Sequence, residues 1–148
     1  MRFILIDKIL LLEPGRNVVA SRLVQPDDDY FRDHFPGFPV VPGVLLTEMM
    51  AQTAGKCLDA ERRSRGKAML AKIVSASFRQ WVRPGDNLLI HADVVANEER
   101  YATAECRVEV EGKTAANSRL FLSFLSVSSL AAEFRDDILE DFMRERGQ

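Results

Sequence analysis

The chain has 148 residues, of which 47% are hydrophobic and 28% are charged, and its formal net charge at pH 7 is −2. This length and composition fit one domain with a packed core and exclude an intrinsically disordered chain. The slightly negative charge argues against a protein that binds nucleic acid through bulk positive charge.

The first part of the chain predicts two strands, over residues 3–15 and 16–24, joined by a turn at Pro14 and Gly15. Its apolar runs are only four residues long, too short for a signal-peptide core or a membrane span. The two cysteines, Cys57 and Cys106, lack a metal-binding spacing and favour inert buried thiols in a reduced environment. A cytoplasmic protein that does not associate with membranes is expected.

A proline-rich loop over residues 25–43 precedes the most apolar helix, which is predicted over residues 44–63. The loop contains four prolines, which break helices and sheet ladders, and two glycines, which permit unusual backbone angles. The helix has no proline and is apolar around nearly its whole circumference for four turns. This pattern predicts a helix buried on all sides.

The second half of the chain predicts four more strands and a closing amphipathic helix. The strands are expected over roughly 68–80, 86–96, 101–110 and 114–127, and the helix over 129–146. The pattern indicates an α+β fold in which a curved, largely antiparallel sheet wraps around the one buried helix. Because such a sheet leaves an open edge, pairing with a second copy is expected. We predict a main domain over 1–128 and a helical extension over 129–148.

The stretch HFPGFPVVPGVLLTEMMAQ, residues 34–52, resembles the 3-hydroxyacyl-(acyl carrier protein) dehydratases of type II fatty-acid synthesis. The likeness extends over residues 3–127 and includes FILIDKILLLEPGRNVVA, ASFRQWVRPGDNLLI and VEVEGKTAANSRLFLSF. The resemblance implies a hotdog fold, a homodimer or trimer of dimers, and an acyl carrier protein that delivers the substrate. It implies a hydro-lyase that uses no cofactor and no metal.

Residue by residue, the resemblance implies that His34 is the catalytic base and Glu48 the catalytic acid. Gly43 matches the glycine whose backbone N–H faces the thioester carbonyl of the substrate. In this family one subunit supplies the histidine and the other the glutamate of each site. A glutamate at position 48, where a sibling branch has aspartate, favours the branch that dehydrates without isomerising.

Dehydration of a 3-hydroxyacyl thioester needs a base at C2 and an acid at the C3 hydroxyl. A histidine can act as the base near neutral pH. A carboxyl group in apolar surroundings keeps its proton and can act as the acid, and Glu48 lies within the apolar helix. The free N–H groups at the helix start, where Gly43 has no side chain, can stabilise negative charge on the carbonyl oxygen.

Other positions have weaker predicted roles. Gln52, one turn after Glu48, is a candidate hydrogen-bond partner of the acid. Trp81 is a candidate substrate contact, because it stands where the family often has proline near the acyl tunnel. Asp33 and Phe38 also depart from the family pattern, and they leave acyl-chain length and pathway open. A basic contact for the acidic carrier protein is predicted from three residues, Lys72, Arg79 and Arg83.

Two other functions compete with the dehydratase. A hotdog thioesterase needs an activated water or a carboxylate nucleophile at the carbonyl, which leaves His34 in this loop unexplained. A non-catalytic acyl-binding partner is expected to have lost His34 or Glu48, and both are present.

Overall fold

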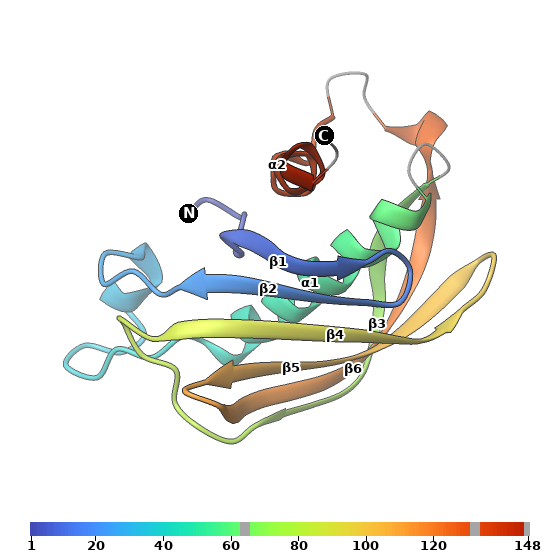
Figure 1. The fold of residues 1–148 in the computed structure, drawn as a ribbon. Helices are drawn as coiled ribbons and strands as arrows, with labels where there is room; N and C mark the ends of the chain where they lie inside the picture. Colours follow the sequence, from blue (N-terminus) through green and yellow to red (C-terminus); the bar gives the residue numbers. More distant parts are fainter. Residues whose placement is uncertain (63–65, 131–133, 147–148) are drawn as a thin grey trace.

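A computed structural model describes residues 1–62, 66–130 and 134–146 of the chain (Figure 1). Its elements in chain order are β1 (Lys8–Glu13), β2 (Asn17–Leu23), the 3-10 turn η1 (Asp29–Arg32), α1 (Gly43–Arg62), β3 (Gly66–Phe78), β4 (Asn87–Asn97), β5 (Tyr101–Val110), β6 (Lys113–Ser126), the 3-10 turn η3 (Val127–Ser129) and α2 (Asp137–Arg146). Within the described part of the chain, neither α-helix combines the length and the apolar character that crossing a membrane requires.

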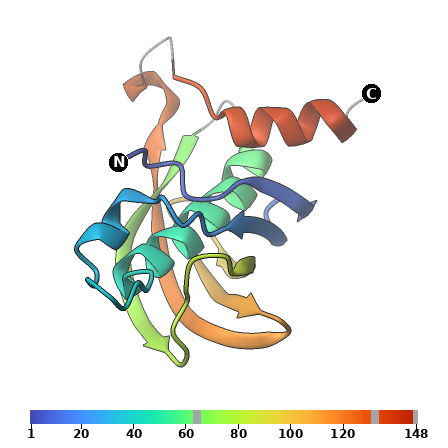
Figure 2. The same ribbon diagram turned by 90° about the vertical axis from the view of Figure 1, so that its left-hand side faces the viewer.

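The six strands form one antiparallel sheet in the order β1-β2-β4-β5-β6-β3. The sheet curves around α1, which lies along its concave face, as the two perpendicular views show (Figures 1 and 2). The prediction of an α+β fold with one sheet wrapped around one long helix is therefore confirmed. β1 and β3 are the two edges of the sheet.

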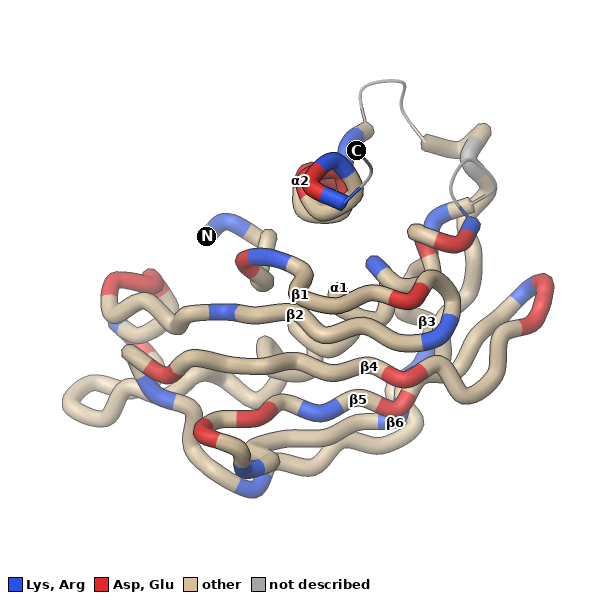
Figure 3. Tube along the Cα trace, viewed as in Figure 1, with Lys and Arg blue, Asp and Glu red and all other residues tan. Residues whose placement is uncertain are grey.

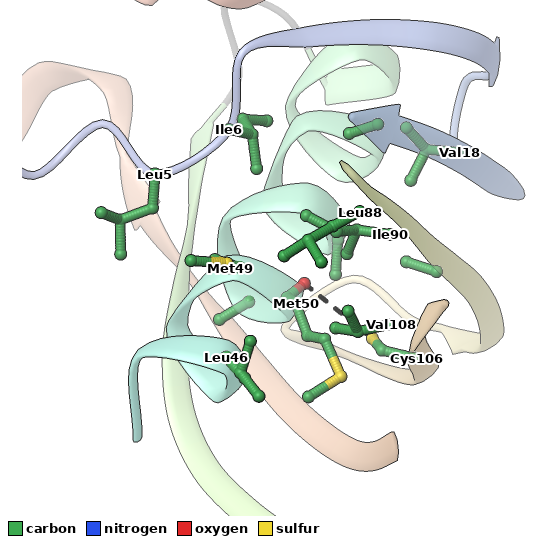
Figure 4. Packing of buried hydrophobic residues seen from close by; sticks show 14 of the residues in the cluster. Leu5, Ile6, Val18, Leu46, Met49, Met50, Leu88, Ile90, Cys106 and Val108 are labelled. Atoms are coloured by element: carbon green, nitrogen blue, oxygen red, sulfur yellow. Dashed lines mark hydrogen bonds between the residues drawn. The ribbon is translucent and has the colours of Figure 1, made fainter. Parts of the chain in front are cut away.

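The hydrophobic core fills the space between α1 and the sheet (Figure 4). Met50 of α1 and Leu88, Ile90 and Val108 of the central strands are all fully buried there, and the Met50 carbonyl accepts a hydrogen bond from the Cys106 thiol of β5 at 3.9 Å. Alternate residues of β4 face inward, as expected for a strand with one face on the core. Burying each such large side chain stabilises the fold by about 1.5–3 kcal/mol.

The prediction that α1 is buried on all sides is wrong for the single chain. Val44, in the first turn, is 76% exposed. Glu48, Gln52 and Lys56 are half-buried and follow one another at intervals of four residues, which places them along one face of the helix. The sheet wraps the opposite side of α1, and this face is contacted instead by Phe3 and Leu5 at Gln52 and by Asp136 at Lys56.

The two ends of the chain also differ from the sequence prediction. Residues 1–7 contain no strand, although Leu5 and Ile6 are fully buried beside α1 (Figure 4). The C-terminal helix α2 begins at Asp137 rather than at 129, while residues 131–133 lie outside the described part. Asp136 sets this start, because its Oδ1 accepts a hydrogen bond from the Leu139 N–H at 3.1 Å, as a helix N-cap does.

Candidate active site

The proline-rich loop places His34 through a short hydrogen-bonded turn. The His34 N–H donates to the Tyr30 carbonyl at 3.0 Å, which ties the residue to the end of η1. Phe35 and Phe38 then exchange backbone hydrogen bonds of 3.0 and 2.9 Å. Gly37 turns the chain between them with φ of 77°, a conformation that glycine adopts at little cost. The loop is thus a defined structure at the point where it carries the histidine.

The His34 imidazole is oriented by the carbonyl oxygen of Val40. Nδ1 of His34 lies 3.0 Å from this oxygen, and the backbone closes the same loop because the Val40 N–H donates to the His34 carbonyl at 3.1 Å. A carbonyl oxygen can only accept, so Nδ1 must carry the proton and donate. In the neutral ring Nε2 then has the free lone pair, which is the arrangement a general base needs. Nothing in the residue pattern predicted this role of Val40, because the contact uses its backbone carbonyl and not its side chain.

The start of α1 follows directly from the loop. The Pro42 carbonyl accepts hydrogen bonds from the N–H groups of Leu45 and Leu46 at 2.9 and 3.2 Å. The first N–H groups of a helix have no acceptor within it and carry a partial positive charge. A Cβ atom at Gly43 would lie 3.2 Å from carbons of the Phe78 ring, closer than an ordinary van der Waals contact. Glycine therefore fits beside this ring without any shift.

The carboxylate of Glu48 is held by Gln52. Gln52 Nε2 donates to Glu48 Oε2 at 3.1 Å and to the Phe3 carbonyl at 3.0 Å. Its Oε1 accepts the Leu5 N–H at 3.0 Å. Because the Gln52 oxygen accepts from Leu5 and its NH₂ group donates to Phe3, it is the NH₂ group that faces Glu48. The predicted contact between Gln52 and Glu48 is present, but the two backbone contacts to the N-terminal residues were not predicted.

The single chain does not bring His34 and Glu48 into contact. Among the described residues, no hydrogen bond or ion pair joins them. The segment between them, residues 35–47, contains no charged residue. It comprises the uncharged loop at the far left of Figure 3 and the first turn of α1, which follows that loop. The base and the acid thus flank an apolar stretch of chain.

Two residues that depart from the family pattern, Phe38 and Trp81, contact each other. Their rings meet edge to face with centroids 6.1 Å apart, and the Arg83 guanidinium lies 5.0 Å from the Phe38 centroid. The Val41 N–H donates to the Val82 carbonyl at 2.8 Å, which joins the loop to this segment. Trp81 is 67% exposed, so it does not plug the core of the single chain.

The remaining predicted residues are exposed and spread over the surface. Arg79 and Arg83 flank Trp81 in the segment that joins β3 to β4, whereas Lys72 lies within β3. The side chain of Asp33 is also exposed, beside the loop. The contacts of the described residues do not bring Lys72 to the two arginines.

Neither cysteine is placed to act as a nucleophile. Both thiols are free and buried. Burial raises the pKa of Cys57 to about 11 and the pKa of Cys106 to about 12. A thiol with a raised pKa is protonated at neutral pH and reacts slowly, because the thiolate is the reactive form.

We therefore expect both thiols to resist iodoacetamide in the folded protein at pH 8. Mass spectrometry should find neither adduct after a treatment that modifies both cysteines in urea. Modification of the folded protein at the rate of a free cysteine would contradict the burial of these side chains.

Comparison with known sequences shows a clear relationship. Residues 1–119 match the family model described as FabA-like domain. The chain is 36% identical to a 3-hydroxyacyl-(acyl-carrier-protein) dehydratase FabZ of Ruminiclostridium cellulolyticum, covering 80% of this chain and 84% of the relative. It is 38% identical to the protein of the same name from Lactobacillus helveticus, covering 77% of this chain and 78% of the relative.

Comparison with solved structures agrees on the fold. A Streptococcus mutans protein solved with acetyl-CoA superimposes with a TM-score of 0.67 at 16% identity, over 85% of this chain and 94% of that one. At this identity the likeness concerns the fold alone. It places the curved sheet and its central helix among the hotdog folds.

Proposed function

Because the chain belongs to the FabA-like family and is a FabZ-type 3-hydroxyacyl-(acyl carrier protein) dehydratase, we propose that His34 and Glu48 carry out its reaction in a site shared by two copies. The reaction removes water from a (3R)-3-hydroxyacyl thioester and gives the trans-2-enoyl thioester. The observation that supports this assignment best is the hydrogen bond from His34 Nδ1 to the Val40 carbonyl, which leaves Nε2 free as a base.

In the proposed reaction, His34 Nε2 takes a proton from C2 of the acyl chain. The electron pair of the broken C–H bond forms the C2–C3 double bond, and the C3–O bond breaks. The leaving oxygen takes a proton from Glu48 and departs as water. His34 is then cationic and Glu48 anionic, and return of one proton from the imidazolium to the carboxylate, directly or through water, restores the starting state.

Glu48 suits the role of acid because of its position on α1. It is half-buried, its neighbours on the helix are apolar, and the Gln52 amide holds one carboxyl oxygen. A second copy that covers the exposed first turn of α1 would remove water from the carboxyl group. Desolvation disfavours the charged form of a carboxyl group, and the acid needs its proton to act.

The start of α1 is the proposed site for the thioester oxygen. Negative charge develops there as C2 loses its proton, and the N–H at Gly43 together with the helix start can stabilise it. Loss of one such donor costs about 3–4 kcal/mol of transition-state stabilisation in comparable sites. The absence of a side chain at Gly43 lets the oxygen approach the backbone.

We propose that β3 is the edge where two copies join. Every residue of β3 from Met69 to Phe78 is exposed in the single chain, on both faces of the strand. Five of these exposed side chains are large and apolar: Met69, Leu70, Ile73, Val74 and Phe78. A long, apolar edge strand is a template for pairing with another strand, and a second β3 satisfies it symmetrically. A homodimer follows from this proposal, and a trimer of such dimers is what the family resemblance implies.

The exposed segment around Trp81 is the proposed entrance for the substrate. Trp81 contacts Phe38, which lies in the same hydrogen-bonded turn as Phe35, and the Phe35 ring stacks on His34 with centroids 4.0 Å apart. Arg79 and Arg83 flank Trp81, and with Lys72 they offer positive charge to an acidic carrier protein.

A direct assay tests the proposed function. The purified protein is incubated with crotonyl-CoA and, separately, with a 3-hydroxyacyl carrier protein, while the enoyl thioester and free thiol are both followed. Interconversion of the hydroxyacyl and enoyl thioesters without thiol release is the expected result. Release of free thiol would indicate a thioesterase, and acyl binding without either reaction would indicate a non-catalytic partner.

A further inference from the structure

We infer that the C-terminal segment, residues 134–146, positions Glu48 through the Lys56–Asp136 ion pair and through the N-terminal segment, residues 1–7. The inference rests on the proposed role of Glu48. The C-terminal segment lies beyond residues 1–119, which match the family model. Its contacts reach the face of α1 that carries the catalytic acid.

The ion pair fastens the C-terminal segment to α1. Lys56 Nζ lies 2.7 Å from Asp136 Oδ2, and the two side chains are only 15% and 12% exposed. The second oxygen of the same carboxylate caps α2 by accepting the Leu139 N–H at 3.1 Å. One side chain therefore both starts α2 and anchors it to the central helix.

Lys56 lies on the same face of α1 as the acid. Gln52 is four residues before Lys56, and Glu48 is four residues before Gln52, so the three side chains follow one another along the helix. Gln52 connects Glu48 to the N-terminal segment by its hydrogen bonds to Phe3 and Leu5. The position of the N-terminal segment therefore determines the orientation of the Gln52 amide relative to the Glu48 carboxylate.

α2 covers the N-terminal segment. Both perpendicular views place α2 beside the start of the chain and over β1 (Figures 1 and 2). Ile138 of α2 lines two cavities, of about 480 and 230 Å³, and Ile4 lines both of them as well. β1 begins only at Lys8, so the segment lies outside that strand. Its ends are tied by the Met1 ammonium to Asp29 and by the Asp7 N–H to the Ser21 carbonyl, while its middle is held by Gln52, by two buried side chains and by α2.

Breaking the ion pair should therefore disturb catalysis without touching the substrate. Once α2 is released, the N-terminal segment loosens, Gln52 loses its contacts to Phe3 and Leu5, and Glu48 loses its fixed orientation. A misplaced catalytic group slows the chemical step, whereas substrate binding depends on other parts of the site. Asp136 and Lys56 are positioning residues in this scheme.

The full-length Asp136→Asn variant tests this inference. Asparagine keeps the cap on α2 but removes the charge. We expect kcat to fall about tenfold with KM changed less than about twofold. Hydrogen exchange at the Leu5 amide should accelerate about tenfold as well. This N–H donates to Gln52, so its exchange rate reports directly on the N-terminal segment. Lys56→Met should reproduce both changes, and Lys56→Arg, which keeps the ion pair, should not.

Asp141→Asn is the matched control. Asp141 makes an exposed ion pair with Arg144 within α2, so this variant has the same chemical change in the same helix without loss of an anchor. Equal kcat and equal Leu5 exchange for Asp136→Asn, Lys56→Met and the control would overturn the inference. If Glu48→Ala is inactive at the same time, the proposed function stands and only the inference fails. A wild-type protein without dehydratase activity would instead overturn the proposed function, and with it the role assigned to the segment.

Discussion

Replacing His34 with alanine is expected to lower kcat/KM for crotonyl-CoA hydration by about 10³-fold, and Glu48→Ala should cause a loss of similar size. General acid–base groups typically contribute about 10²–10⁴-fold to a rate. In the proposed reaction His34 is the base at C2, and Glu48 is the acid whose proton makes the C3 hydroxyl a leaving group. Steady-state hydration and dehydration kinetics of the folded variants measure both losses.

Two residues of the same types provide the controls. His91 lies on β4, where its Nδ1 accepts a hydrogen bond from Arg107 at 3.3 Å, and it has no role in the proposed site. Glu61 lies in the last turn of α1 and accepts a hydrogen bond from Asn97 at 2.8 Å. His91→Ala and Glu61→Ala should retain most of the wild-type activity. If these two control variants lost as much activity as His34→Ala and Glu48→Ala, the losses would reflect reduced stability of the fold and not the proposed chemistry.

Glu48→Gln separates the acid from its packing. Glutamine has nearly the shape of glutamate and can still accept a hydrogen bond from Gln52, but it has no acidic proton to donate. Dehydration should therefore be lost while substrate binding remains. A Glu48→Gln protein with near wild-type kcat would show that this carboxyl group is not the acid.

The fold was largely predictable because each element has a local signature. On β4, Leu88, Ile90 and Ala92 alternate with more accessible residues, which identifies a strand with one face on the core. α1 has no proline and many good helix formers, and its observed bounds agree with the prediction within one residue. Such patterns depend only on near neighbours in the sequence.

The contacts that the sequence did not predict join residues far apart in the chain. Gln52 binds Phe3 and Leu5, which lie almost fifty positions earlier, and Phe38 meets Trp81. Local periodicity contains no information on such pairs, because they depend on how distant segments outside the strands pack together. The C-terminal helix was predicted eight residues too early for a related reason: apolar spacing alone does not show that Asp136 caps the helix and pairs with Lys56.

We propose one explanation for the exposed first turn of α1 and the exposed edge of β3. The sequence pattern of α1 predicts burial on all sides, yet Val44 is 76% exposed in the single chain. β3 likewise exposes apolar side chains on both faces. A second copy joined at β3 is the simplest partner for these surfaces, and it would bring its own Glu48 or His34 toward the half-site of the first.

A shared site makes a quantitative prediction for mixed subunits. In a dimer of one His34→Ala chain and one Glu48→Ala chain, one site lacks both groups and the other has both intact. Random exchange makes half of the dimers mixed, so about a quarter of the wild-type activity should return. Neither variant alone should show activity, and mass-labelled chains can verify that exchange is complete.

Activity of the exchanged mixture is the most direct test of the shared site. We predict recovery to about one quarter of the wild-type rate, rising with the measured fraction of mixed dimers. A mixture that stays as inactive as its two parents after exchange is verified would contradict a site built from His34 of one chain and Glu48 of another.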